Sequence, residues 1–266
     1  MLLAEVEYAR PSTLDEALRL LAANDGARAL AGGQTLTNVM KARAAAPDVL
    51  VDLNALDELR TIRRTGDGGL ELGAMATYTD VVRSSDVGDA RPILAEVALQ
   101  IADVQVRNRG TIGGNVCSND PTNHLPPLLV ALGATMTIRG AAGERDVPAE
   151  DFFLGVYMTA VAQGELLTKV RLRPARGGDA FEAVTIGRDG TCIVNAAVAV
   201  DGDARVALGC VAAVPVLVTV PMEDEAVRNA VAGAVVDPPS DVHASAEYRR
   251  HLAGVLAVRA VRKAKS

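Results

Sequence analysis

Two glycine turns offer the clearest chemistry in this chain. Residues 31–35 are Ala-Gly-Gly-Gln-Thr, and residues 111–115 are Thr-Ile-Gly-Gly-Asn. Because glycine lacks a Cβ atom, its backbone can adopt a positive φ and lie within hydrogen-bonding distance of an oxyanion. Two such turns could hold both phosphates of a dinucleotide through main-chain N–H groups. A nucleotide cofactor is therefore the first hypothesis.

Neither turn has the spacing of a well-known phosphate-binding motif. The Rossmann motif G-x-G-x-x-G and the P-loop motif G-x-x-x-x-G-K-[ST] are both missing from them. A single Gly-Gly pair is a weak signal, since such pairs occur in many connections between strands and helices. Two pairs, each followed by a hydroxyl or amide side chain, strengthen the hypothesis without identifying the ligand.

The composition narrows the class of protein. The chain has 266 residues, of which 49% are apolar and 23% charged, as in a globular protein. Its net charge of −6 argues against nucleic acid as a partner. No stretch approaches ~20 uninterrupted apolar residues, so we expect no membrane span. The acidic N-terminus lacks the basic region of a signal peptide.

Metal-ligating side chains are scarce. Cys117, Cys192 and Cys210 lie far apart without a C-x-x-C pair, and the three histidines are not spaced as ligands. An iron–sulfur cluster or a structural zinc ion needs a larger set of such ligands. We therefore expect no metal site in this chain, and a reducing, cytoplasmic environment.

Apolar periodicity predicts a compact α/β unit at the start of the chain, and a mixed region after it. A helix begins near Pro11, with the capping-box spacing at Thr13 and Glu16. The patterns then predict, in order, a strand at 27–30, a helix from Thr35, a strand at 49–53, a hairpin at 61–73, a helix at 91–103, a short helix at 126–132, and strands at 135–139 and 144–147.

A segment rich in proline and glycine, residues 174–179, separates this region from the last part of the chain. There the patterns predict antiparallel strands at 181–186, 193–200 and 205–211, and helices at 223–232 and 246–265. Residues 188–191 predict a turn.

Several motifs together resemble a known family. Residues 31–35, 51–54 and 107–115 are similar to the FAD-binding subunit of molybdenum hydroxylases, a family that includes the medium subunit of aerobic carbon monoxide dehydrogenase and the flavin domain of xanthine dehydrogenase. Residues 101–103, 164–168 and 248–252 fit the same pattern. The resemblance spans essentially the whole chain.

The resemblance implies an α+β fold with two domains. Residues 1–172 would form a FAD-binding domain of the vanillyl-alcohol-oxidase type, with lobes at about 1–56 and 57–172. Residues 173–266 would form a small α+β domain with a three-stranded antiparallel sheet and helices.

The resemblance also implies where FAD binds. Its diphosphate would lie between the glycine turns, and Leu36 and Val116 are candidates to wall the isoalloxazine ring. The family usually has an aspartate nine residues beyond Asn115, whereas this chain has His124 there, with Asp120 nearby. The implied FAD contacts are Ala31, Gly32, Gly33, Gln34, Thr35, Ile101, Ala102, Thr111, Ile112, Gly113, Gly114, Asn115, His124 and Leu167, with no catalytic residue and no metal ligand.

The function implied by the resemblance is electron transfer. Electrons would pass from a [2Fe–2S] small subunit to FAD and on to an external acceptor, and a large subunit with the molybdenum cofactor would oxidise the substrate. Two alternatives stay open, a stand-alone flavin oxidase or reductase and a flavin-free scaffold subunit. The sequence identifies neither the substrate nor the acceptor, which could be NAD, a quinone or oxygen.

Overall fold

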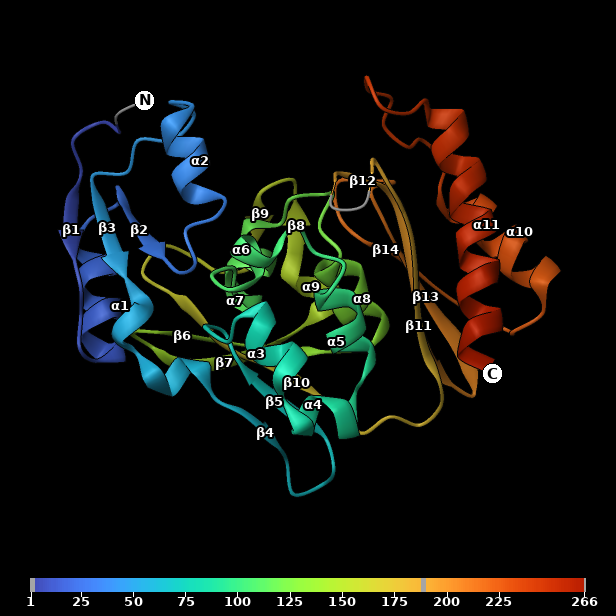
Figure 1. The fold of residues 1–266 in the computed structure, drawn as a ribbon, viewed down its shortest axis with the longest axis horizontal. Coiled ribbons are helices and arrows are strands. Elements are labelled where there is room, and N and C mark those ends of the chain that lie inside the picture. Colours follow the sequence, from blue (N-terminus) through green and yellow to red (C-terminus); the bar gives the residue numbers. More distant parts are fainter. Residues whose placement is uncertain (1–2, 188–189, 266) are drawn as a thin grey trace.

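The structure, a computed structural model, describes residues 3–187 and 190–265. Its helices and strands form three blocks that lie side by side in the order of the chain (Figure 1). We call them the first block (residues 7–60), the second block (62–172) and the third block (179–265). The turn predicted at 188–191 falls partly outside the described residues. None of the helices described is long and apolar enough to cross a membrane.

The first block is a small parallel sheet with strand order β1-β3-β2, drawn in blue in Figure 1. Thr13 caps its first helix by accepting a hydrogen bond from the Glu16 N–H (3.2 Å), as the spacing predicts. The first glycine turn connects β2 to α2. The elements are β1 (Glu7–Ala9), α1 (Leu14–Ala23), β2 (Ala27–Leu30), α2 (Leu36–Lys41), β3 (Val49–Asp52), η1 (Leu53–Ala55) and η2 (Asp57–Arg60).

The second block is built on an antiparallel sheet with strand order β4-β5-β10-β6-β7. The predicted hairpin at 61–73 and the strands near 135–147 are confirmed, but the central strand β10 is additional to the prediction. The elements are β4 (Ile62–Arg64), β5 (Leu70–Gly73), α3 (Tyr78–Arg83), α4 (Ser85–Ala90), α5 (Ile93–Ala98), α6 (Val104–Arg107), α7 (Ile112–Ser118), α8 (Leu125–Ala131), β6 (Thr135–Gly140), β7 (Gly143–Pro148), α9 (Ala149–Phe152), β8 (Phe153–Gly155), β9 (Met158–Thr159) and β10 (Leu166–Leu172).

The helix predicted at 91–103 is shorter than expected. Helix α5 ends at Ala98, and a separate helix, α6, begins at Val104. Between them the backbone of Ala102 turns into the left-handed region (φ 44°), which an α-helix excludes. The prediction was wrong here because a non-glycine residue in this conformation leaves no mark on the apolar periodicity.

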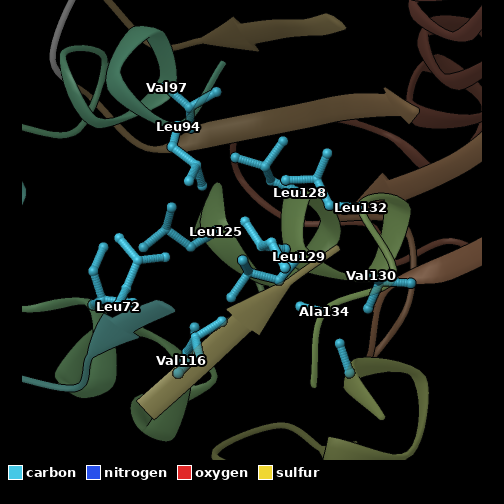
Figure 2. Close-up of a cluster of buried hydrophobic side chains, with 14 of the residues drawn as sticks. Leu72, Leu94, Val97, Val116, Leu125, Leu128, Leu129, Val130, Leu132 and Ala134 are labelled. Atoms are coloured by element: carbon cyan, nitrogen blue, oxygen red, sulfur yellow. The ribbon is translucent and has the colours of Figure 1, made fainter. Parts of the chain in front are cut away.

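Helix α8 lies at the centre of the main core. Every residue from Leu125 to Ala131 is buried, since α8 has neighbours on all sides. Figure 2 shows Leu125 and Leu129 of α8 gathered with Leu72 of β5 and Val116 of α7. The second glycine turn forms the start of α7. The packing of α7 against this core therefore holds the turn in place.

The third block is an antiparallel sheet in the order β11-β12-β13-β14, with α10 and α11 beside it (Figure 1). The three-stranded sheet expected here is wrong, because a fourth strand follows the three predicted ones. Val216–Val220 is a short apolar run without alternation, and its pairing with β13 defines it as a strand. The elements are β11 (Asp179–Thr185), β12 (Cys192–Asp201), β13 (Asp203–Gly209), β14 (Val216–Val220), α10 (Asp224–Ala234) and α11 (Ala246–Lys265).

The second and third blocks share a core and an ion pair. Phe181 of β11 and Ala197 of β12 belong to the same apolar cluster as Leu128 of α8. The buried Arg91 guanidinium bonds to the carboxylate of Asp179 (2.6 Å), the last residue of the predicted linker. The third block therefore supports the second block from the side opposite to the first block (Figure 1).

Candidate functional site

A cavity of about 650 Å³ lies where the first and second blocks meet, and both glycine turns line it. Its volume is typical of a cofactor site. All the predicted contact residues line it except Ile112 and His124. Those that do are Ala31, Gly32, Gly33, Gln34, Thr35, Ile101, Ala102, Thr111, Gly113, Gly114, Asn115 and Leu167.

The backbone of the first glycine turn packs against the residues just before the second turn. A Cβ atom on Gly32 would lie 2.0 Å from the carbonyl oxygen of Arg109 and 2.9 Å from Cα of Gly110. A Cβ atom on Gly114 would lie 3.6 Å from Cβ of Ala31. Only glycine permits so close an approach at position 32, so bends about 80 residues apart in sequence form one wall of the cavity.

The first turn presents unpaired donors. The N–H groups of residues 32–36 donate no hydrogen bond to any of the described residues. Gly33 adopts φ +73°, the left-handed region that favours glycine. A run of main-chain N–H groups with no protein acceptor can bind phosphate oxygens. This turn therefore fits the diphosphate of a dinucleotide.

In the second turn, the main-chain donors of residues 112–115 are already used within the protein. The N–H of Gly113 bonds to the Ala74 carbonyl (2.8 Å), and the N–H of Ile112 bonds to the Ala76 carbonyl (2.9 Å). The N–H of Gly114 bonds to the Thr111 hydroxyl (3.0 Å), which caps α7. Residues 112–115 therefore offer the cavity their side chains and Cα atoms rather than free N–H groups.

Asn115 places an unsatisfied acceptor on the cavity wall. Its Nδ2 donates to the hydroxyl of Tyr78 (2.9 Å), while its Oδ1 is buried without a partner among the described residues. Burial raises the pKa of Tyr78 to about 12, so this hydroxyl stays neutral. Since buried polar atoms are nearly always paired, this Oδ1 is an exception beside the cavity.

A strained bend forms another part of the wall. Ala102 has φ 44°, and the carbonyls of Ile101 and Ala102 both accept hydrogen bonds from the Arg107 guanidinium. Strained backbone of this kind persists only where the surroundings hold it in place, and it is frequent at binding sites. Arg107 therefore fixes the two predicted contact residues of this bend.

Three predicted side chains lie behind the wall. Ile112 is buried, and Val116 packs in the core that Figure 2 shows rather than on the cavity. The His124 ring packs at a tilt against the ring of Phe181 in the third block, with 5.1 Å between ring centroids. Asp120 is also absent from the lining, but its carboxylate accepts a hydrogen bond from Tyr157 (3.2 Å), which lines the cavity.

The cavity has many lining residues that sequence reasoning did not select, although Leu36 was selected and is present. Leu53, Gly110, Glu165 and Leu166 lie within the motifs that resemble the family, although they were not selected as contacts. Most of the others are apolar or small, so no local pattern separates them from ordinary core. These others are Arg28, Ala29, Val39, Ala74, Met75, Tyr78, Val106, Cys117, Ser118, Asn123, Tyr157 and Val161. Across residues 3–187 and 190–265, no group of three or more metal-ligating side chains gathers.

Comparison with known proteins identifies the family. Residues 4–174 match the FAD binding domain in molybdopterin dehydrogenase, and residues 179–264 match the CO dehydrogenase flavoprotein C-terminal domain. The carbon monoxide dehydrogenase medium chain of Afipia carboxidovorans is 37% identical, and the alignment covers 100% of this chain and 99% of the relative. The xanthine dehydrogenase FAD-binding subunit of Escherichia coli O157:H7 is 31% identical over 63% of this chain and 57% of its own length.

A solved structure agrees with this result. In reconstituted CO dehydrogenase from Oligotropha carboxidovorans, one chain superposes with a TM-score of 0.93 at 35% identity, and the match covers 99% of both chains. The α+β fold is thus shared over the whole length. The chain belongs to the family of FAD-binding oxidoreductase subunits of molybdenum hydroxylase-type enzymes, and FAD is its cofactor.

Proposed function

We propose that this chain transfers electrons within a molybdenum hydroxylase complex. It receives them from a [2Fe–2S] small subunit and passes them through FAD to an external acceptor. The observation that carries the proposal is the cavity between the glycine turns, where unpaired N–H groups line one side. Support for the partners comes from the relative named above, which is the medium chain of a carbon monoxide dehydrogenase.

The proposed FAD contacts follow the lining of the cavity. The N–H groups of residues 32–36 hold the diphosphate, and the Thr111 hydroxyl and Asn115 Oδ1 provide polar contacts on the facing wall. Leu36, Ile101 and Leu167 provide apolar walls, and they exclude water from the bound cofactor. The proposed set omits Ile112 and His124, whose side chains lie outside the lining.

The bound flavin supplies redox chemistry, since it accepts electrons singly and releases them in pairs. The protein needs no general acid or base for this task. The two charged groups on the lining are already engaged: Glu165 pairs with Arg145 (2.7 Å), and Arg28 donates to the Ala27 carbonyl (2.8 Å). The hydrogen bond from Arg145 lowers the pKa of Glu165, and burial raises the pKa of the Cys117 thiol to about 12.

These features favour electron transfer over the two alternatives. A stand-alone oxidase or reductase needs a proton-transferring group beside its substrate, and the charged groups on the lining are held by other partners. A scaffold subunit without flavin needs no open cavity with unpaired donors.

We also propose that residues 1–172 form the FAD-binding domain, of the vanillyl-alcohol-oxidase type with lobes at about 1–56 and 57–172, and that residues 173–266 form the second domain.

The substrate of the complex is proposed to depend on the large subunit. The two relatives are named for carbon monoxide and xanthine, although both carry a FAD-binding chain of this family. Chains of one family therefore occur in enzymes that are named for different substrates.

Purification of the complex from its native cells tests the proposal. We expect two further polypeptides, one with [2Fe–2S] centres and one with a molybdenum cofactor. Addition of substrate should bleach the iron–sulfur and flavin absorbance in turn. A chain that purifies alone, or a flavin that a small organic donor reduces directly on the isolated chain, would overturn it.

A further inference from the structure

Every peptide carbonyl of the first glycine turn, from Ala31 to Thr35, accepts a hydrogen bond. Two of these bonds belong to the start of α2. The Thr37 N–H donates to the Gly33 carbonyl (3.1 Å), and the Val39 N–H donates to the Thr35 carbonyl (3.0 Å).

The other carbonyls bond to side-chain amides. Asn54 Nδ2 donates to the Ala31 carbonyl (3.0 Å), Gln34 Nε2 donates to the Gly32 carbonyl (3.0 Å), and Asn38 Nδ2 donates to the Gln34 carbonyl (2.8 Å). Gln34 and Asn38 belong to the turn and its helix. Asn54 alone among these three reaches the turn from another strand connection, in η1 after β3.

These bonds determine the direction of the free N–H groups. In a trans peptide the C=O and the N–H point in opposite directions, so a bond that holds the carbonyl also holds the N–H on the other edge. The described chain has no cis peptide bond. By holding the Ala31 carbonyl, Asn54 therefore orients the N–H of Gly32, a residue that packs against Arg109 and Gly110 just before the second turn.

Asn54 is itself held on several sides. Its Nδ2 also donates to Asp52 Oδ1 (2.6 Å), and its Oδ1 accepts from the Arg60 guanidinium (3.1 Å). The donor and acceptor ends of the amide are thus both assigned by their partners. Asn54 cannot rotate without losing these bonds, so it presents its second N–H rigidly to Ala31.

Asp52 anchors this arrangement below the turn. It is buried, and its carboxylate accepts from the Tyr8 hydroxyl and from the main-chain N–H of Asn54 (2.9 Å). Burial alone would raise the pKa of Asp52, but the hydrogen bonds from Tyr8 and Asn54 lower it below the usual value. The carboxylate therefore stays an acceptor at neutral pH.

We propose that Asn54 is a positioning residue for the diphosphate of FAD: its hydrogen bond to the Ala31 carbonyl aims the Gly32 N–H at the cofactor. This inference rests on the proposed function, since it concerns how the same cavity holds FAD. Without the bond the Ala31–Gly32 peptide can rotate, and the donor is lost to the phosphate although the side chain of Asn54 never touches it.

The test compares Asn54→Ala with a matched control in the full chain. Asn108→Ala removes another side-chain amide close to the second turn, one that bonds to Thr79 and to no carbonyl of the first turn. For each variant the dissociation constants of FAD and of ADP, which shares the diphosphate, are measured by calorimetry on the apoprotein. The ³¹P resonances of bound FAD and the unfolding midpoint of the apoprotein are measured as well.

We expect N54A to raise the dissociation constants of FAD and ADP by about tenfold and to shift the ³¹P resonances of bound FAD. We expect N108A to match the wild type. Wild-type affinity and unshifted ³¹P resonances in N54A would overturn the inference, as would weaker binding with unshifted resonances, which indicates a merely structural role. If N54A does not fold, Asn54→Ser removes the amide donor with a polar side chain in place. Failure of the proposed function is a separate result, because then the wild-type chain takes up no FAD.

Discussion

The two glycine turns look alike in sequence and differ in what their backbones do. The first leaves the N–H groups of residues 32–36 without an acceptor among the described residues, while in the second those of residues 112–115 are bonded to the Ala74 and Ala76 carbonyls and to Thr111. Glycine is needed at Gly32 and Gly113 for the same reason, which is close approach of another backbone segment. Hydrogen bonding, and not the presence of glycine, thus decides which turn can receive a phosphate.

The largest expected effect concerns the second turn and the fold. A Cβ atom on Gly113 would lie 2.7 Å from both the Cβ and the carbonyl oxygen of Ala74, where backbone blocks any adjustment. We expect Gly113→Val to lower the free energy of unfolding by about 3 kcal/mol, since overpacking displaces α7 from the sheet. Urea unfolding of the apoprotein measures this, and a wild-type value would mean that the second turn does not depend on that contact.

Gly114 separates cofactor binding from folding. A Cβ atom there would lie 2.9 Å from the Thr111 hydroxyl and 3.6 Å from Ala31, on the cavity side of the turn. We expect the Gly114→Val variant to keep most of the stability of the wild type. Its affinity for FAD should fall by more than about 100-fold, because the valine side chain enters the space beside the first turn. Flavin content after purification is the readout, and normal flavin content in a folded variant contradicts the proposed placement.

Because Tyr78 is buried against the second turn, we expect the free energy of unfolding to depend on pH. The pKa of Tyr78 is about 12 in the folded chain against 10.0 for the free side chain, so the unfolded state ionises first. Its contribution to stability is complete below pH 10 and is lost as the pH rises towards 12, by about 2 to 3 kcal/mol. Denaturant unfolding at several pH values should show this loss in the wild type, and Tyr78→Phe should reduce it. An equally steep loss of stability in Tyr78→Phe would show that another group causes the pH dependence.

The smallest effect concerns the first turn. Gly33 has φ +73°, and a Cβ atom there would lie 3.2 Å from the Thr37 hydroxyl, so alanine fits with strain rather than a clash. We expect Gly33→Ala to cost about 1 kcal/mol of stability and to weaken FAD by about fivefold. A fluorescence titration with FAD measures the affinity. A loss of FAD affinity as large as that of Gly114→Val would contradict the smaller effect expected at Gly33.

Much of this could be predicted from local patterns. The cap at Thr13, the strands β2, β3 and β11 to β13, and the meeting of the two turns all follow from spacing and from the family resemblance. Strand β10 had a readable signal, because Lys169 and Arg171 alternate with the buried Val170 and Leu172. Its neighbours β5 and β6 lie far away in sequence, so only the assembled sheet makes it central.

Other features had no local signal. The left-handed Ala102 is neither glycine nor asparagine, and nothing nearby in the sequence marks the bend that Arg107 holds. The second turn loses its donors to the Ala74 and Ala76 carbonyls, which lie in a segment almost 40 residues earlier in the chain. Pairing over such distances depends on tertiary packing, so the different roles of the turns emerge only in the folded chain.

Amide NMR of the isotope-labelled apoprotein, recorded during a titration with ADP, tests the central claim most directly. The account predicts downfield shifts and slower hydrogen exchange for the N–H groups of residues 32–36, with little change for those of residues 112–115, which are already bonded within the protein. Equal changes at both turns, or none at residues 32–36, would contradict it.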